Sequence, residues 1–232
     1  MEISVYSLVF LTAAIFCFVL SYYSWLRKKV IGAFELSLLL FSAGIWVFFV
    51  FFESAATSVE SKIFWSKVSY IGVVTTPVFY FLFVMRFTGH EIFTKFKQYL
   101  ILFILPVITL CFTYTNEFHH LIWTGFSPIS DTTNIMAYYH GFWFWVGYLI
   151  YSYVLLLIST IQLILFILKY KNGFLYKGWV VVLAGMFPWI ASGFYIAAIS
   201  PVPGLDLTPF FFVVSGFLFA LGFLRSKLLN LA

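Results

Sequence analysis

The sequence predicts an all-α integral membrane protein, a seven-transmembrane helix bundle with its N-terminus outside and its C-terminus in the cytoplasm. Of the 232 residues, 63% are hydrophobic and only 9% are charged, whereas a soluble domain carries roughly a quarter charged residues. The few charges fall in gaps between long apolar runs, and these gaps alternate between basic and nearly cation-free. Composition, run length and charge distribution therefore lead to one fold class.

Seven apolar runs are long enough to cross a hydrocarbon core of about 30 Å, which takes about 20 helical residues. We expect helices near residues 5–26, 33–53, 64–85, 99–115, 142–168, 179–199 and 208–224. The first run is not a cleaved signal peptide, because the stretch before it contains Glu2 and no cation, and no small-residue cleavage site follows. Residues 1–232 are thus expected to form a single seven-helix domain without a cytoplasmic output domain.

Proline and small residues mark special points in the later runs. Pro77, Pro106 and Pro188 each free a backbone carbonyl inside an expected helix. We expect ordinary helix bending at these prolines in preference to a hinge between two packings, since prolines are common in membrane helices without being hinges. In the last run, Thr208 is expected to cap the helix, with Pro209 at its first position. Gly216 and Ala220, four residues apart, allow close helix contact and leave a homodimer possible.

Lysine and arginine give the orientation. Eleven of these cations lie in one set of gaps and two, Lys62 and Lys67, lie in the other. The eleven are Arg27, Lys28, Lys29, Arg86, Lys95, Lys97, Lys169, Lys171, Lys177, Arg225 and Lys227. Cytoplasmic loops carry such an excess, so the C-terminus is predicted to be cytoplasmic. The net charge of +5 then suits anionic lipid headgroups and requires no nucleic-acid partner.

Several function classes are disfavoured by what the runs lack. No Asp, Glu, Lys or Arg lies in the middle of an expected helix, whereas pumps and ion-coupled transporters generally need such groups at the midplane. A retinal Schiff base needs a buried lysine, and the last run has only Lys227 beyond its end. There is no glycine-rich phosphate loop, and we expect no enzymatic activity from this chain. Cys17 and Cys111 are expected to be small buried hydrophobes.

The connection from residue 116 to residue 141 is long for a loop, and it carries three of the four histidines. Around it the sequence reads TNEFHHLIW at 115–123 and YHGFWFW at 139–145, and PVPGLDLTP follows at 201–209. With FWSKVSYIG at 64–72, FTGHE at 87–91 and the closing RSKLLNL, the chain resembles the N-terminal seven-transmembrane sensor region of membrane histidine kinases. The family more often has arginine at His90 and aspartate at Asn230.

The resemblance implies a signal-input module whose last helix passes a displacement to a cytoplasmic kinase or other output domain, in cis or in trans. For the outer face, the resemblance implies a set of candidate ligand-binding residues: Asn116, His119, His120, Trp123, His140, Trp143 and Asp206. The candidates for signal transmission are Arg225, Lys227, Leu228 and Leu229. The chain lacks the phosphoacceptor histidine and the ATP-binding domain, so it is not expected to be a kinase itself.

Chemistry leaves the role of the outer residues open. The histidines could bond loop carbonyls and interfacial aromatic partners, line a pocket for a small ligand or peptide, or report external acidity. A divalent metal on His119, His120 and His140, zinc or copper, is the minority alternative, and no cofactor is otherwise expected. Asp206 could brace the start of the last helix or contact ligand. The outer Trp and Tyr residues are expected to form an aromatic belt.

Two function classes then compete. The favoured one is a multi-pass sensory receptor in the cell membrane, with the lipid bilayer, an output domain and an unknown small ligand as partners. The alternative is a small membrane transporter or channel, although no inverted repeat is evident. A membrane scaffold is a third possibility.

Overall fold

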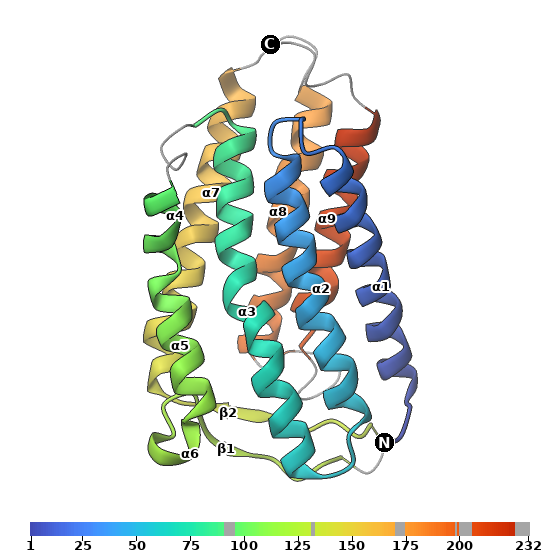
Figure 1. Ribbon diagram of the computed structural model, residues 1–232, viewed down its shortest axis with the longest axis vertical. Coiled ribbons are helices and arrows are strands. Elements are labelled where there is room, and N and C mark those ends of the chain that lie inside the picture. The colour runs from blue at the N-terminus through green and yellow to red at the C-terminus, as the bar shows by residue number, and fades with distance from the viewer. Residues whose placement is uncertain (91–95, 131–132, 170–174, 198, 200–205, 226–232) are drawn as a thin grey trace.

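The computed structural model is a bundle of long helices that alternate in direction (Figure 1). It describes residues 1–90, 96–130, 133–169, 175–197, 199 and 206–225. A two-stranded sheet lies across one end of the bundle, near the start of the first helix, and we call this the sheet end. The last described helix finishes at the other end.

The first three helices are α1 (Val5–Leu26), α2 (Ala33–Ala55) and α3 (Val59–Phe87). Ser4 and Ser7 form a capping box at the start of α1, and Ser58 accepts a hydrogen bond from the Ser61 N–H at the start of α3. That cap explains why α3 begins at Val59 and not near residue 64 as the apolar run predicted. The polar first turn of α3 is helical and turns Lys62 into the protein.

The fourth predicted span, 99–115, is wrong as a single helix. The structure has α4 (Phe96–Leu102), α5 (Ile104–Tyr114) and a short α6 (Asn116–His119). Pro106 has no N–H to offer to the Leu102 carbonyl four residues earlier. The Tyr151 hydroxyl donates to that carbonyl instead, at 2.6 Å. A tyrosine of another helix therefore satisfies the carbonyl that Pro106 frees.

The sheet corrects the expectation of a purely helical chain. Strands β1 (Trp123–Phe126) and β2 (Tyr138–His140) pair antiparallel, with Trp123 opposite His140 and Phe126 opposite Tyr138. The intervening loop reverses through Asn134, whose φ of 54° lies in the left-handed region that asparagine tolerates. Each strand is too short for its alternation to be recognised in the sequence.

The remaining helices are η1 (Phe144–Leu149), α7 (Ile150–Lys169), α8 (Leu175–Ile196) and α9 (Thr208–Arg225). The predicted 142–168 run is thus a π-helical turn followed by an α-helix. At Gly147 an added Cβ would come within 2.2 Å of the Trp143 ring, so the indole packs directly on this turn. Helix α8 begins and ends earlier than the predicted 179–199, and α9 matches 208–224 within a residue.

Small polar residues join α1 to α2. The buried positions of α1 repeat at intervals of three and four and are mostly small: Ser7, Phe10, Ala14, Cys17, Ser21 and Ser24. Ser21 and Ser37 exchange hydrogen bonds to each other's carbonyl oxygens, at 2.8 and 2.9 Å. Small residues allow the helix backbones to approach closely, as is common between membrane helices.

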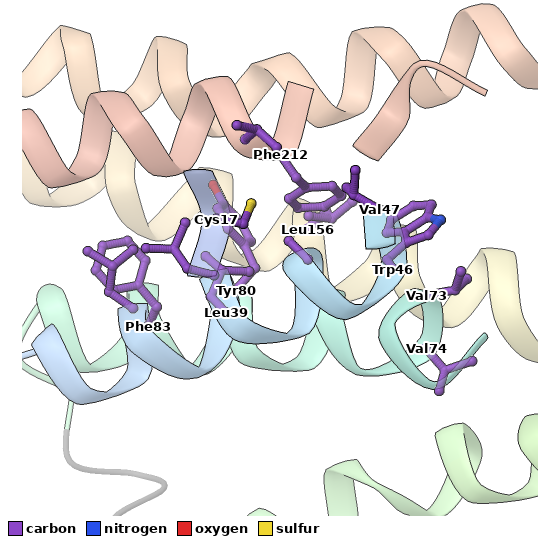
Figure 2. Packing of buried hydrophobic residues seen from close by; sticks show 14 of the residues in the cluster. Cys17, Leu39, Trp46, Val47, Val73, Val74, Tyr80, Phe83, Leu156 and Phe212 are labelled. Carbon is purple, nitrogen blue, oxygen red and sulfur yellow. The ribbon is translucent and has the colours of Figure 1, made fainter. Parts of the chain in front are cut away.

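Helix α2 lies at the centre, with contacts to α1, α3 and α9. Figure 2 shows its side chains Leu39, Trp46 and Val47 packed among residues from neighbouring helices. Gly216 of α9 faces Leu40 of α2, where an added Cβ would come within 2.2 Å. The close contact foreseen for Gly216 is therefore made within the chain, and a homodimer stays a prediction.

Four helical stretches in the described part of the chain are long and apolar enough to cross a membrane: α1, α2, α3 and Phe144–Lys169. Shorter apolar helices cover Tyr99–Tyr114 and Leu183–Ile196. Large apolar side chains are exposed on the outward faces, including Ile15 and Val19 of α1 and Leu157 of α7. Such a surface suits lipid, and the chain is a multi-pass membrane protein.

Candidate functional site

A cavity of about 140 Å³ lies inside the sheet end of the bundle. Its walls come from α1, α2, α3, β1, β2, η1, α7, α8 and the start of α9. The charged or titratable groups Glu53, Lys62, His140 and Asp206 all face it. Segments far apart in the sequence therefore bring their polar side chains to one enclosed place.

Glu53 and Lys62 connect the end of α2 to the loop between the strands. The Lys62 ammonium donates to the carbonyl oxygens of Glu53, at 3.0 Å, and Asn134, at 2.7 Å. The Asn134 amide in turn donates to the Ser54 and Ala56 carbonyls. The Tyr138 hydroxyl donates to the Glu53 carboxylate at 2.9 Å. These bonds use the last carbonyls of α2, which have no partner within the helix.

Asp206 stands where the cavity meets α9. Its Oδ1 accepts the Thr208 N–H at 2.8 Å, so the carboxylate caps the first turn of the helix. Because the group is buried, the pKa of the Asp206 carboxyl is raised above its usual value. Asp206 therefore braces the helix, which is one of the two roles weighed for it from the sequence. It also faces the cavity, and contact with a ligand stays a prediction.

His140 is held between aromatic rings. Its ring stacks on Phe144 with centroids 3.6 Å apart, and its Nε2 lies 3.2 Å from the Tyr195 hydroxyl. Its buried Nδ1 has no hydrogen-bond partner among the described residues. Burial lowers the pKa of His140 to about 4. The imidazole is therefore neutral near pH 7, which argues against external acidity sensing by this histidine near its usual pKa.

Trp123 forms part of the cavity wall and not of an outer belt. It is 1% exposed, and its ring meets Tyr70 edge-on at 5.2 Å and Tyr138 at 5.3 Å. Tyr139, the neighbour of Tyr138 on β2, is 55% exposed on the opposite side of the strand. The alternation of β2 thus separates a cavity tyrosine from a surface tyrosine.

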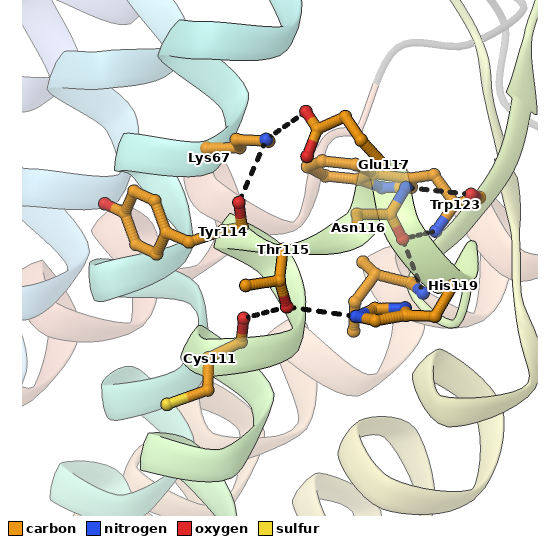
Figure 3. A network of polar contacts seen from close by, with 9 residues as sticks. Lys67, Cys111, Tyr114, Thr115, Asn116, Glu117, His119 and Trp123 are labelled. Carbon is orange, nitrogen blue, oxygen red and sulfur yellow. Dashed lines mark hydrogen bonds and ion pairs between the residues drawn. The ribbon is translucent and has the colours of Figure 1, made fainter.

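Asn116 and His119 lie outside the cavity and shape the connection leading to β1 (Figure 3). Asn116 is 5% exposed, its Oδ1 accepts the N–H groups of Ile122 and Trp123, and its Nδ2 donates to the Trp123 carbonyl. His119 accepts the Leu121 N–H at Nδ1 and pairs with the Thr115 hydroxyl through Nε2. Both side chains therefore bond groups of the connection and of the neighbouring helix. His119 has a structural role, but its partners are an N–H and a hydroxyl and not the expected loop carbonyls.

His120 and Trp143 are also outside the cavity lining. His120 is exposed and adopts a φ of 54° at the end of α6. The Trp143 indole N–H donates to the Thr109 hydroxyl at 3.0 Å, which fixes η1 to α5. Nearby, Lys67 pairs with Glu117 on the protein surface (Figure 3). Of the seven residues expected at the outer face, the structure brings Trp123, His140 and Asp206 together at the cavity.

A metal centre on the three histidines is not formed in this arrangement. Within the described ranges, no three His, Cys, Asp or Glu side chains are grouped so that they could hold a metal ion. The transmission candidates Lys227, Leu228 and Leu229 lie outside the described residues, and α9 ends at Arg225.

Sequence reasoning missed Glu53, Lys62 and Tyr195 as cavity residues, and it assigned Tyr138 to the outer aromatic belt in preference to an aromatic cavity. A signal for two of them was present. Lys62 is one of only two cations in its set of gaps, and Glu53 is a carboxylate near the end of an otherwise apolar run. Tyr195 gave no such signal, because 15 tyrosines are spread through the chain.

The family model for the N-terminal 7TM region of histidine kinase matches residues 9–232. Searches of curated proteins and of solved structures gave no match. The matched family is a sensor region and not a kinase catalytic domain. With this match over nearly the whole sequence, the chain belongs to the family of N-terminal seven-transmembrane regions of histidine kinases.

Proposed function

We propose that this chain is the sensory input module of a histidine-kinase-type signalling protein, and that the cavity at the sheet end is its stimulus site. The cavity is the observation that carries the proposal, because it gathers polar and aromatic groups from most of the bundle. Ligand sites are typically concave, mostly apolar and furnished with a few polar groups. The stimulus is an external or membrane-dissolved molecule.

The charge pattern supplies the orientation of this receptor. We infer seven spans, with the sheet end outside the cell membrane and the end of α9 in the cytoplasm, because eleven of thirteen cations fall in the gaps at that end. The shorter apolar helices and α9 complete the count of spans beyond the four longest. In this orientation the cavity lies at the outer end of the bundle, on the side from which an external stimulus arrives.

The start of α9 connects the cavity to the output. Thr208 and Phe212 of α9 line the cavity, and Asp206 caps the same turn. An occupant that moves this turn would displace α9 as a body, since a helix is stiff along its axis. The displacement would pass Arg225 and then Lys227, Leu228 and Leu229 toward an output domain in cis or in trans.

The packing between the cavity and the end of the bundle where α9 finishes favours a receptor over the alternative, a transporter or channel. Leu40, Tyr80 and Phe83 are fully buried in the half of the bundle beyond the cavity. Conduction would require a path through these side chains. A receptor requires only that the occupied and empty cavities favour different helix arrangements.

Filling the cavity tests the proposal without knowledge of the ligand. Ser192 of α8 lines the cavity, and its hydroxyl lies 3.0 Å from the Tyr153 hydroxyl. A cavity of this size holds about one benzene-sized molecule, so Ser192→Phe should occupy it. The matched control is Gly193→Phe, because an added Cβ at this exposed neighbour meets no atom within 4 Å.

The measurement is autophosphorylation of the histidine kinase to which this chain signals, in membranes isolated from cells grown under different conditions. We expect Ser192→Phe to hold the phosphorylation at one level under all growth conditions, while Gly193→Phe responds like the wild type. Equal and normally regulated output in both variants would refute the cavity as the stimulus site.

A further inference from the structure

The acidic groups of the cavity exceed the available basic ones. Glu53 and Asp206 both line it. In the part of the chain that the structure describes, the single ion pair between side chains is Lys67–Glu117, so neither cavity carboxylate forms a close ion pair, and Lys62 attracts Glu53 only at longer range. His140, whose pKa is lowered to about 4, is neutral near pH 7. Lys62 is the one basic group left to consider at the wall.

The Lys62 ammonium is already committed. It is 1% exposed and donates to two backbone carbonyls, those of Glu53 and Asn134. Its charge therefore stabilises the negative end of the α2 dipole, and two of its N–H donors are taken by backbone carbonyls. An anionic occupant would find two carboxylates and no free cation. A cationic occupant would be attracted by both carboxylates.

The walls are also suited to a positive charge. Indole and phenol rings of Trp46, Trp123, Tyr70 and Tyr148 surround the cavity. Tyr70 contacts both Trp123 and Tyr148 through its ring, at 5.2 and 6.3 Å between centroids. Aromatic faces attract ammonium groups, and the attraction is stronger where water is excluded. Carboxylates behind aromatic walls form the usual recognition pattern for organic cations.

Volume limits the size of the occupant. About 140 Å³ is close to the volume of an apolar cavity that accepts benzene. The occupant therefore has on the order of six to eight heavy atoms. Serine hydroxyls at Ser66, Ser69 and Ser152 add hydrogen-bonding groups for a short polar substituent.

From this charge balance, lining and volume we infer that the cavity binds a small organic ammonium ion, held by Glu53 and Asp206 against the aromatic walls. The inference rests on the proposed function, since it names the chemical class of the stimulus. The same ammonium chemistry occurs in free amines and in lipid headgroups that carry choline or ethanolamine.

Three small molecules of similar shape but different charge distinguish the effect of charge on binding from the effect of shape. Choline is compared with dimethylbutanol, its neutral isostere in which carbon replaces nitrogen, and with dimethylbutanoate, an anion of similar size. Binding to the full chain is measured by calorimetry in nanodiscs of phosphatidylglycerol, which has no ammonium group. We expect choline to bind at least about tenfold more tightly than the neutral isostere, and the anion not to bind.

The two carboxylates are tested by Glu53→Gln and Asp206→Asn. Each amide keeps an oxygen that can accept the Tyr138 hydroxyl or the Thr208 N–H, so both variants should fold. Each is expected to weaken choline binding by about tenfold. Glu60→Gln is the matched control, because Glu60 is an exposed carboxylate at the same end that does not line the cavity. It should bind like the wild type.

A second disc preparation that contains phosphatidylcholine identifies the source of the ammonium group. Loss of free choline binding in these discs indicates a lipid headgroup, and unchanged binding indicates a free amine. The inference is overturned if the isostere or the anion binds as well as choline, if both variants bind choline normally, or if choline does not bind. Each of these results leaves the Ser192→Phe test of the stimulus site intact.

Discussion

Gly72→Ala should weaken the contact between α2 and α3 beside the cavity. A Cβ added at Gly72 would lie 2.5 Å from the Trp46 backbone nitrogen and 2.6 Å from the Ser42 carbonyl oxygen. Both are backbone atoms and cannot rotate away, so the helices must separate. Separation also stretches the hydrogen bonds of Ser42 to the hydroxyls of Thr75 and Thr76.

The magnitude follows from three contributions. Overpacking a close contact costs about 1–3 kcal/mol, and each weakened hydrogen bond between membrane helices costs about 0.6 kcal/mol. Against these, alanine gains about 1 kcal/mol over glycine in a helix interior. We expect Gly72→Ala to destabilise the protein by about 2 kcal/mol, which lowers the unfolding temperature by about 4–8 °C for a domain of this size.

Thermal unfolding in detergent, followed by circular dichroism, measures the effect. Gly193→Ala is the control, because it makes the same chemical change in α8 where the Cβ meets nothing within 4 Å. It should leave the unfolding temperature unchanged or raise it slightly. If Gly72→Ala unfolds at the same temperature as Gly193→Ala, the backbone contact between α2 and α3 does not contribute as described.

Two further predictions concern the sheet end. Asn116→Ala leaves two N–H groups and a carbonyl without their partner and should cost about 2–4 kcal/mol of stability. We expect faster proteolysis of the outer connection in this variant. Glu117→Ala on the exposed surface is the control and should change the cleavage rate little. Choline binding should weaken as the pH falls, because the raised pKa of Asp206 lets a proton compete with the cation at a higher pH than for an ordinary carboxyl. Calorimetric affinities in a pH series, with Asp206→Asn as the variant of reduced dependence, test the sign, and tighter binding at low pH would contradict it.

The sequence predicted the parts of the fold that depend on apolar length and charge. The bounds of α1, α2 and α9 agree with the apolar runs within about two residues. The break at Phe103 could not be located, because it depends on Pro106 together with a tyrosine of another helix. The sheet was missed because four residues in one strand and three in the other are too few for a pattern.

The site was predicted in part for a related reason. His140 and Asp206 were both assigned to the outer face by the resemblance, and both line the cavity. His119 drew attention by its residue type, yet both its ring nitrogens serve the connection itself. Which polar side chains face inward depends on helix rotation and on the path of the loop. Lys62 shows this, since a lysine counted as an outer surface charge is buried.

The fixed and movable parts of the bundle are divided in a way that suits signalling through α9. Backbone contact at Gly72 and the Ser42 hydrogen bonds tie α2 to α3. Helix α9 is joined to α8 by the Ser215 hydroxyl, which donates to the Ala184 carbonyl at 2.5 Å, and it meets α2 at Gly216, against a flexible leucine side chain and not backbone. A change in the cavity therefore meets less resistance in moving α8 and α9 together than in separating α2 from α3, which is the division of contacts that the proposed transmission through α9 requires.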